Sequence, residues 1–277
     1  MKAHRILQRI RQSPFASSTA FVCYGAALLL ALLNANFITG TLTNLYEDAA
    51  WDLSPSAERA FAYGERHFNG QDKAAYDVDR AEYFFREAVK LDPSLVYVHH
   101  ELARIHFLRG HFWDAMAQIN TQIEEHGDDT PNSYYVRGLI EGYMGNYADS
   151  ARDYEHFLKF DPRNWAGIND YAWVLLKAGR AKDAKVATDE GLKYFPDNPW
   201  LLNSSAIALY EMGKLKEADV QVKKAWTAVQ KVKEPEWLRS YPGNDPAIAG
   251  QGIATFRKSV QENMHSIALA IASSTVQ

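Results

Sequence analysis

The chain has 277 residues, of which 47% are hydrophobic and 23% charged, so it can bury a sizeable core and is not disordered overall. Its 30 Lys and Arg stand against 34 Asp and Glu, and without the four basic residues before position 12 the remainder carries about −8. That balance excludes a general nucleic-acid binder, because phosphate binding needs a basic face. The only cysteine, Cys23, excludes disulfides and Cys-based zinc sites within one chain.

The amino terminus combines a basic segment, 1–15, with a stretch that has no charged residue, 12–46. Residues 16–38 are predominantly apolar and long enough to span about 30 Å of hydrocarbon as a helix. Four Lys or Arg precede this stretch and none follows until Arg59, which by the positive-inside rule leaves the amino terminus in the cytoplasm. We therefore predict a transmembrane signal anchor at 16–38 in a bacterial inner membrane. The residues after the anchor are expected to be extracytoplasmic, in the periplasm.

Two alternatives for this segment remain open. A cleaved signal peptide would use Thr39-Gly40-Thr41, which is a weak small-residue site. A mitochondrial presequence is also compatible, since the first 20 residues contain Arg and Ser but no acidic residue. The linker 39–56 that follows is expected to form a short helix or a stalk.

A helix–turn–helix unit follows, most clearly at 133–162. Gly145-Asn146 allows a tight turn between two amphipathic helices, and Pro162 ends the second helix. Gly138 and Ser150, twelve residues apart, are small enough for the two helices to cross closely.

The same unit recurs with a period of 34 or 35 residues, which indicates a repeat architecture over 57–230. Four repeats begin near Val96, Pro131, Trp165 and Pro199, and one more lies upstream with about five extra residues in its turn, around 69–76. The turn glycines are Gly110, Gly145, Gly179 and Gly213, and the small-residue pairs are Ala103/Ala115, Gly138/Ser150, Ala172/Ala184 and Ala206/Ala218.

These residues resemble the tetratricopeptide repeat (TPR), whose 34-residue helix–turn–helix has small residues, a turn glycine, an aromatic and a closing proline at these offsets. With its amino-terminal segment, the chain is similar to membrane-anchored TPR proteins of the bacterial type. The resemblance implies an all-α fold: a right-handed superhelical solenoid of about five repeats, preceded by one transmembrane helix and closed by a C-terminal capping helix.

The C-terminal segment, 231–277, departs from the period. A turn-rich stretch, 241–246, is followed by a predicted helix that starts at Pro246, with Asp245 as its N-cap, and ends near Ala272. Its apolar stripe consists of Ile253, Phe256, Val260, Met264, Ile267 and Ile271. The stripe suits a helix that caps the solenoid, and the alternative is a partner-binding helix or self-association through 247–272.

Catalytic and metal-binding patterns were not found. Four histidines cluster in sequence, His99, His100, His106 and His111, but Arg104 stands where an H-E-x-x-H motif needs histidine. Because adjacent helical residues diverge by about 100°, we expect the four not to converge and predict no metal site and no cofactor. Arg137 and Glu141, one turn apart, are expected to form a local ion pair, with a polar binding strip as the alternative.

The resemblance also implies a binding surface, because TPR proteins use the concave wall built by the first helix of each repeat. Transferred to this chain, the partner-binding residues are Tyr97, His100, Arg104, Phe107, Tyr135, Tyr143, Asn169, Trp173, Trp200, Asn203 and Tyr210. Asn169 and Asn203 lie one repeat apart, and each amide can donate to and accept from a peptide backbone. The aromatic residues offer rigid contact area, although each can instead pack on the neighbouring repeat.

The sequence thus predicts a non-catalytic protein–protein interaction and assembly scaffold, tethered to the membrane and binding a peptide or helix of a partner in the groove. Two alternatives remain: a self-associating structural subunit of an envelope complex, and an enzyme without a recognisable motif.

Overall fold

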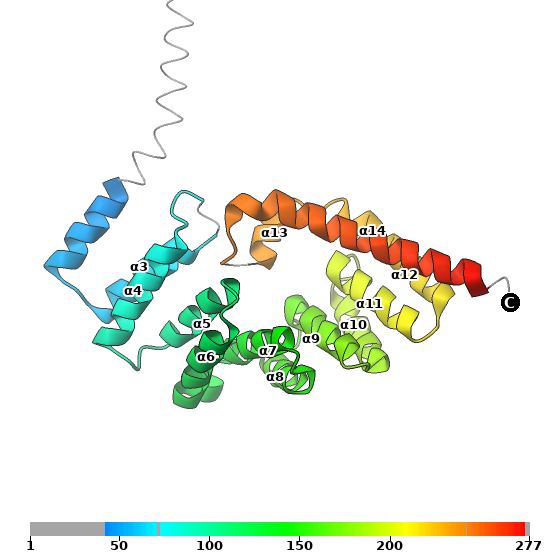
Figure 1. Cartoon of the computed structure of the whole chain (residues 1–277), viewed down its shortest axis with the longest axis horizontal. Helices are drawn as coiled ribbons and strands as arrows, with labels where there is room; N and C mark the ends of the chain where they lie inside the picture. Colours follow the sequence, from blue (N-terminus) through cyan, green and yellow to red (C-terminus); the bar gives the residue numbers. More distant parts are fainter. Residues whose placement is uncertain (1–41, 71–72, 242, 275–277) are drawn as a thin grey trace, which may run out of the picture. The chain divides into compact units, whose positions relative to one another are not determined.

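A computed structural model describes residues 42–70, 73–241 and 243–274 (Figure 1). The chain divides after Pro55 into two units. Of the first unit, the structure describes one helix over 42–53, within the predicted linker. The predicted anchor at 16–38 lies outside the described residues. Among the residues that are described, no helix combines the length and apolar character needed to cross a bilayer.

The second unit begins with five consecutive antiparallel helix pairs, which confirms the predicted helix–turn–helix organisation. The pairs are α3 (Ala57–Phe68) with α4 (Val78–Leu91), α5 (Val98–Leu108) with α6 (Phe112–His126), α7 (Asn132–Met144) with α8 (Tyr147–Phe160), α9 (Trp165–Lys177) with α10 (Ala181–Tyr194), and α11 (Pro199–Glu211) with α12 (Leu215–Val229). A short 3₁₀ helix, η1 (Gly127–Asp129), connects the second and third pairs. Each pair also packs on the next, as a solenoid requires.

The turn inside each of the last four pairs is set by one glycine in the left-handed region. Gly110, Gly145, Gly179 and Gly213 have φ of 74°, 86°, 72° and 75°. In each turn the residue directly after the glycine donates its backbone N–H to the carbonyl oxygen five residues earlier, which is the Schellman arrangement. These bonds run from His111 to His106, Asn146 to Glu141, Arg180 to Leu175 and Lys214 to Leu209, at 2.8–2.9 Å.

The small-residue pairs lie where the two helices of a repeat cross, as predicted. All six alanines of these pairs are fully buried. In the third repeat the Ser150 hydroxyl donates to the Gly138 carbonyl at 2.5 Å, and a Cβ at Gly138 would stand 3.2 Å from the Tyr154 ring. Larger side chains here would separate the helices. Each repeat has one such crossing, so the small residues recur with the 34-residue period.

The C-terminal segment differs in detail from the prediction. An additional helix, α13 (Glu234–Ser240), precedes the turn, and Asp245 caps a 3₁₀ turn, η2 (Pro246–Ile248), through a 2.8 Å bond from Ala247 N–H. The long helix α14 (Ala249–Ser274) therefore begins three residues after Pro246. Proline at 235 and 246 each occupies a first turn, where its missing N–H costs nothing.

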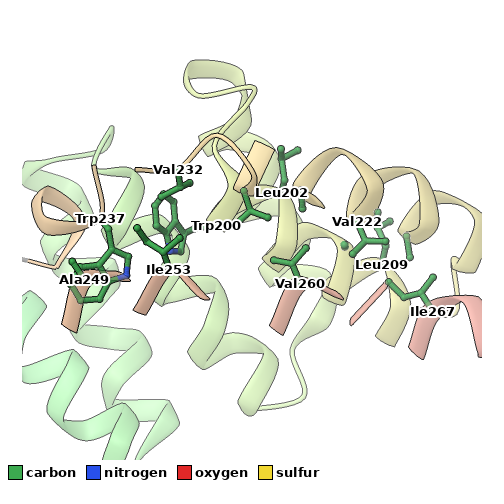
Figure 2. Close-up of a cluster of buried hydrophobic side chains, with 14 residues drawn as sticks. Trp200, Leu202, Leu209, Val222, Val232, Trp237, Ala249, Ile253, Val260 and Ile267 are labelled. Carbon is green, nitrogen blue, oxygen red and sulfur yellow. The ribbon is translucent and has the colours of Figure 1, made fainter. Parts of the chain in front are cut away.

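The apolar stripe of α14 packs against the fifth repeat, chiefly on α12 (Figure 2). Ile253, Val260 and Ile267 are buried in one cluster with Trp200 and Leu209. This packing agrees with the predicted cap, because α14 covers apolar surface that a sixth repeat would otherwise cover.

Candidate partner-binding site on the inner wall

The first helices of the second to fifth repeats, α5, α7, α9 and α11, contact one another in a row and form what we call the inner wall. The residues predicted for the groove belong to these helices, except Tyr97, which precedes α5 with φ of 70°. These helices lie on the same side of the solenoid as α13 and α14 (Figure 1). The exposure of the predicted groove residues, however, differs from one residue to the next.

Three aromatic side chains from consecutive repeats form a continuous aromatic row: Phe107, Tyr143 and Trp173. The Tyr143 ring lies 5.1 Å from Phe107, edge-on at 87°, and 5.5 Å from Trp173 at 46°. Tyr143 is 58% exposed, whereas its two neighbours are partly buried. Aromatic pairs with these separations hold one another in place, so the row presents a preorganised apolar surface to solvent.

Beside the aromatic row lies a hydrogen-bonded chain centred on Asp170, which the sequence-based prediction missed. Tyr135 donates its hydroxyl to Asp170 Oδ2 at 2.6 Å, and Asn169 donates its amide to Oδ1 at 3.2 Å. Asn169 in turn accepts from Ser204 Oγ at 2.8 Å. Burial raises the pKa of Asp170 to about 6, and burial together with that carboxylate raises the pKa of Tyr143. The negative charge of Asp170 therefore contributes to the electrostatic potential at the aromatic row.

A signal for Asp170 was present in the repeat alignment. It lies two residues before the small residue of the fourth repeat, and Glu101 holds the same place in the second repeat. Glu101 is buried as well, accepts from Arg104 Nη1 at 2.6 Å, and has its pKa raised to about 7 by burial. Two acidic residues at a position that packs inward indicate a polar layer behind the wall.

Two predicted groove residues are buried rather than presented. His100 is 6% exposed, with Nδ1 at 3.1 Å from Ser133 Oγ, and burial lowers its pKa to about 3, so it is neutral. Trp200 is 5% exposed, because Phe256 of α14 stacks on it at 4.9 Å and 11°. Trp200 also donates its indole N–H to the Tyr241 hydroxyl at 2.8 Å.

The predicted amide pair has partners within the chain. Asn169 is bonded to Asp170 and Ser204, as described, and Asn203 Oδ1 accepts from Asn263 of α14 at 3.0 Å. In this conformation Asn169 joins two helices of the wall, α9 and α11, and Asn203 joins α11 to α14. Their role in binding a peptide stays a prediction that requires these bonds to exchange.

The C-terminal segment also contacts the first repeats. Tyr76, in the predicted insertion, donates its hydroxyl to the Gly243 carbonyl at 2.8 Å, and Lys73 lies 3.2 Å from the Glu234 carboxylate. A Cβ at Gly243 would stand 2.7 Å from Arg104 Nη2, whose guanidinium lies over the Phe68 ring at 4.7 Å. Arg104 therefore already has contacts within the chain. Tyr143, in the aromatic row, is the most exposed aromatic residue of the predicted groove.

One expectation about charged residues was wrong. Arg137 does not pair with Glu141; it forms two bonds with Asp153 of α8, Nε to Oδ2 at 2.6 Å and Nη2 to Oδ1 at 2.8 Å. Of the four clustered histidines, the turn between α5 and α6 brings two, His106 and His111, together beside Asp114, whereas His99 and His100 lie against Gln118 and Ser133.

Comparison with known proteins agrees with this fold. No protein-family model and no curated protein sequence matches the chain. Among solved structures, a crystal structure of MamA protein superposes with a TM-score of 0.53 at 18% identity, over 63% of this chain and 92% of MamA. YrrB, described as a TPR protein with an unusual peptide-binding site, superposes with a TM-score of 0.54 at 11% identity, over 74% of this chain and 97% of YrrB. At these identities the likeness establishes the fold alone, and that fold is a TPR-like solenoid.

Proposed function

We propose that this chain is a membrane-tethered, non-catalytic scaffold that binds a peptide segment or helix of a partner protein along the aromatic row of its inner wall. The observation that carries the proposal is Tyr143, an aromatic side chain 58% exposed and held between Phe107 and Trp173. Exposed aromatics fixed in this way bind with little loss of conformational entropy and commonly dominate interface energies. The peptide-binding site named for YrrB supports the class of ligand.

The chemistry around the aromatic row also suggests what the partner carries. The Asp170 carboxylate contributes to the raised pKa of Tyr143, Tyr135 and Tyr241, which shows that its negative charge reaches this surface. An acidic side chain on a docked peptide would therefore be repelled. An apolar anchor for the aromatic row with a Lys or Arg close to it fits this surface.

Replacing Tyr143 with alanine is expected to weaken the binding of such peptides at least about tenfold, equivalent to roughly 1.4 kcal/mol. Peptides would first be selected from a displayed random library on the full-length chain, and their affinities measured by fluorescence anisotropy. Tyr194→Ala is the matched control, because Tyr194 is 44% exposed on α10, away from the wall. Selected peptides that bind the Tyr143 variant as tightly as the wild type would rule out this surface.

The membrane tether is proposed from the charge asymmetry around 16–38, with the repeats in the periplasm. A reporter that is active only outside the cytoplasm is expected to work when fused after Gln277 of the full-length chain. A reporter active only in the cytoplasm serves as the matched fusion and should stay silent. The opposite pattern would reverse the orientation, and a mature chain that starts downstream of Asn36 would replace the anchor with a cleaved signal.

A further inference from the structure

The turn between α5 and α6 places two histidines side by side. Gly110, at φ of 74°, closes the Schellman turn, and the His111 N–H donates to the His106 carbonyl at 2.9 Å. In such a turn the side chains of the two bonded residues face each other, usually as an apolar contact. Here both are imidazoles, with ring centroids 6.3 Å apart. The backbone thus converts a sequence separation of five residues into a contact.

A third side chain joins them from the first turn of α6. Asp114 lies three residues after His111, and an acidic residue holds this place in each of the last four repeats: Asp114, Asp149, Asp183 and Glu217. In the fourth repeat Arg180, the counterpart of His111, bonds Asp183 at 2.7 Å, and in the fifth Lys214 lies 3.8 Å from Glu217. In these two repeats the turn therefore brings the two positions within contact distance.

The last four repeats provide an internal comparison for the first histidine. The counterparts of His106 are Glu141, Leu175 and Leu209. Leu175 and Leu209 are buried, so leucine satisfies the turn and histidine is not required for folding there. Among these four turns, only that of the second repeat combines two imidazoles with a carboxylate.

We propose that His106, His111 and Asp114 form a binding site for a divalent transition-metal ion, with Zn²⁺ as the ion that fits best. One ligand atom from each side chain lies within 4.8 Å of the other two, so small rotations would bring all three onto one ion. Two imidazole nitrogens and one carboxylate oxygen are a donor set that Zn²⁺ accepts, and water would complete the tetrahedron.

The surroundings of the three side chains agree with this assignment. The Nδ1 atom of His106 is shielded from solvent without a hydrogen-bond partner among the described residues, so it is available to a metal ion. His111 and Asp114 are exposed and, with Met144, line an open hollow of ≈ 380 Å³. The ion thus has an entry path and room for a water ligand.

The competing explanation is a simple ion pair between a protonated His111 and Asp114, as Arg180 and Asp183 make. That pair leaves the polar His106 unexplained at a position where leucine serves two other repeats. The two explanations differ in whether His106 is needed for metal binding.

The deciding experiment is zinc titration by calorimetry on the metal-stripped, full-length chain and on His106→Leu/His111→Lys. This double variant copies the residues of the fifth repeat, Leu209 and Lys214, in the same turn, so it is expected to fold. We expect one zinc per wild-type chain, which raises its Tm by binding the native state. Affinity should fall at least about tenfold in the double variant, and cobalt bound to the wild type should show the absorption of a tetrahedral site.

His265→Ala is the matched control, because it removes an exposed histidine of α14 and should leave zinc binding unchanged. Asp114→Asn adds a conservative test that keeps the size of the side chain and should weaken binding. Zinc binding that is undiminished in the double variant, or no saturable binding by the wild type at micromolar zinc, would overturn the proposal. Binding lost equally in the control would overturn it as well, since it would mean nonspecific histidine coordination.

Discussion

At pH 8, replacing Glu141 with glutamine is expected to raise the free energy of unfolding by about 1–3 kcal/mol. Glu141 is half-buried on α7, and its Oε2 is shielded from solvent without a hydrogen-bond partner among the described residues. Arg137, one turn earlier on α7, forms two bonds with Asp153, and its Nη1 lies 3.3 Å from Asn120 Oδ1. Glu141 therefore has the negative charge of Asp153 beside it, and it forms no ion pair with the part of the chain that the structure describes.

The direction of the pH dependence follows from these contacts. Burial, and then the charge of Asp153, raise the pKa of Glu141 from 4.5 to about 7 in the native state. Below pH 4.5 both native and unfolded states hold the proton, so the residue costs nothing. Between pH 4.5 and about 7 the unfolded state ionises while the native state still holds the proton, so stability falls over this range and stays low above it. Glutamine removes this cost and can still donate a hydrogen bond to Asp153.

Urea unfolding at pH 4 and pH 8 measures the effect. The gain from Glu141→Gln should be present at pH 8 and absent at pH 4, with the full pKa shift reduced by the partial exposure of the side chain. Glu124→Gln, an exposed glutamate on α6, is the matched control and should change stability by less than about 0.5 kcal/mol at either pH. An equal gain at both pH values would show that the amide improves packing and that charge is not the cause.

The repeat fold was predictable from the sequence because its constraints recur. Each turn inside the last four helix pairs has a glycine with positive φ, such as Gly145, and each crossing inside those pairs has small residues, such as Ala172 and Ala184. A rule that repeats at a fixed interval is visible in one sequence without any structure.

Features that occur once were missed for a physical reason. The contact between Tyr76 and Gly243 joins residues at opposite ends of the array, and no periodicity encodes it. The contacts of α14 with Asn203 and Trp200 likewise require the C-terminal segment to fold back along the repeats. The meeting of His106 and His111 was missed because helical geometry was applied across a turn that breaks the helix.

Replacing Ile267 with alanine is expected to lower the free energy of unfolding by about 2–5 kcal/mol, the range for a fully buried aliphatic side chain. Ile267 has no exposed surface and belongs to the cluster that α14 forms with α11 and α12, including Leu209 and Val222 (Figure 2). The loss combines the missing hydrophobic contacts with the cavity left between three helices that cannot close fully around it. Thermal or urea unfolding of the full-length chain measures it.

The same helix supplies the control and decides between a cap and an association surface. Leu269, two residues on, is 55% exposed, so Leu269→Ala should change stability by no more than about 0.5 kcal/mol. If α14 caps its own fifth repeat, light scattering should find one mass for the wild type and both variants, and only Ile267→Ala should unfold early. If the stripe instead joined two chains, Ile267→Ala would shift the mass towards the monomer, and stability would depend on concentration. A concentration dependence seen in the wild type and absent from Ile267→Ala would show that the stripe is a dimer contact. It would favour the self-associating subunit over the scaffold.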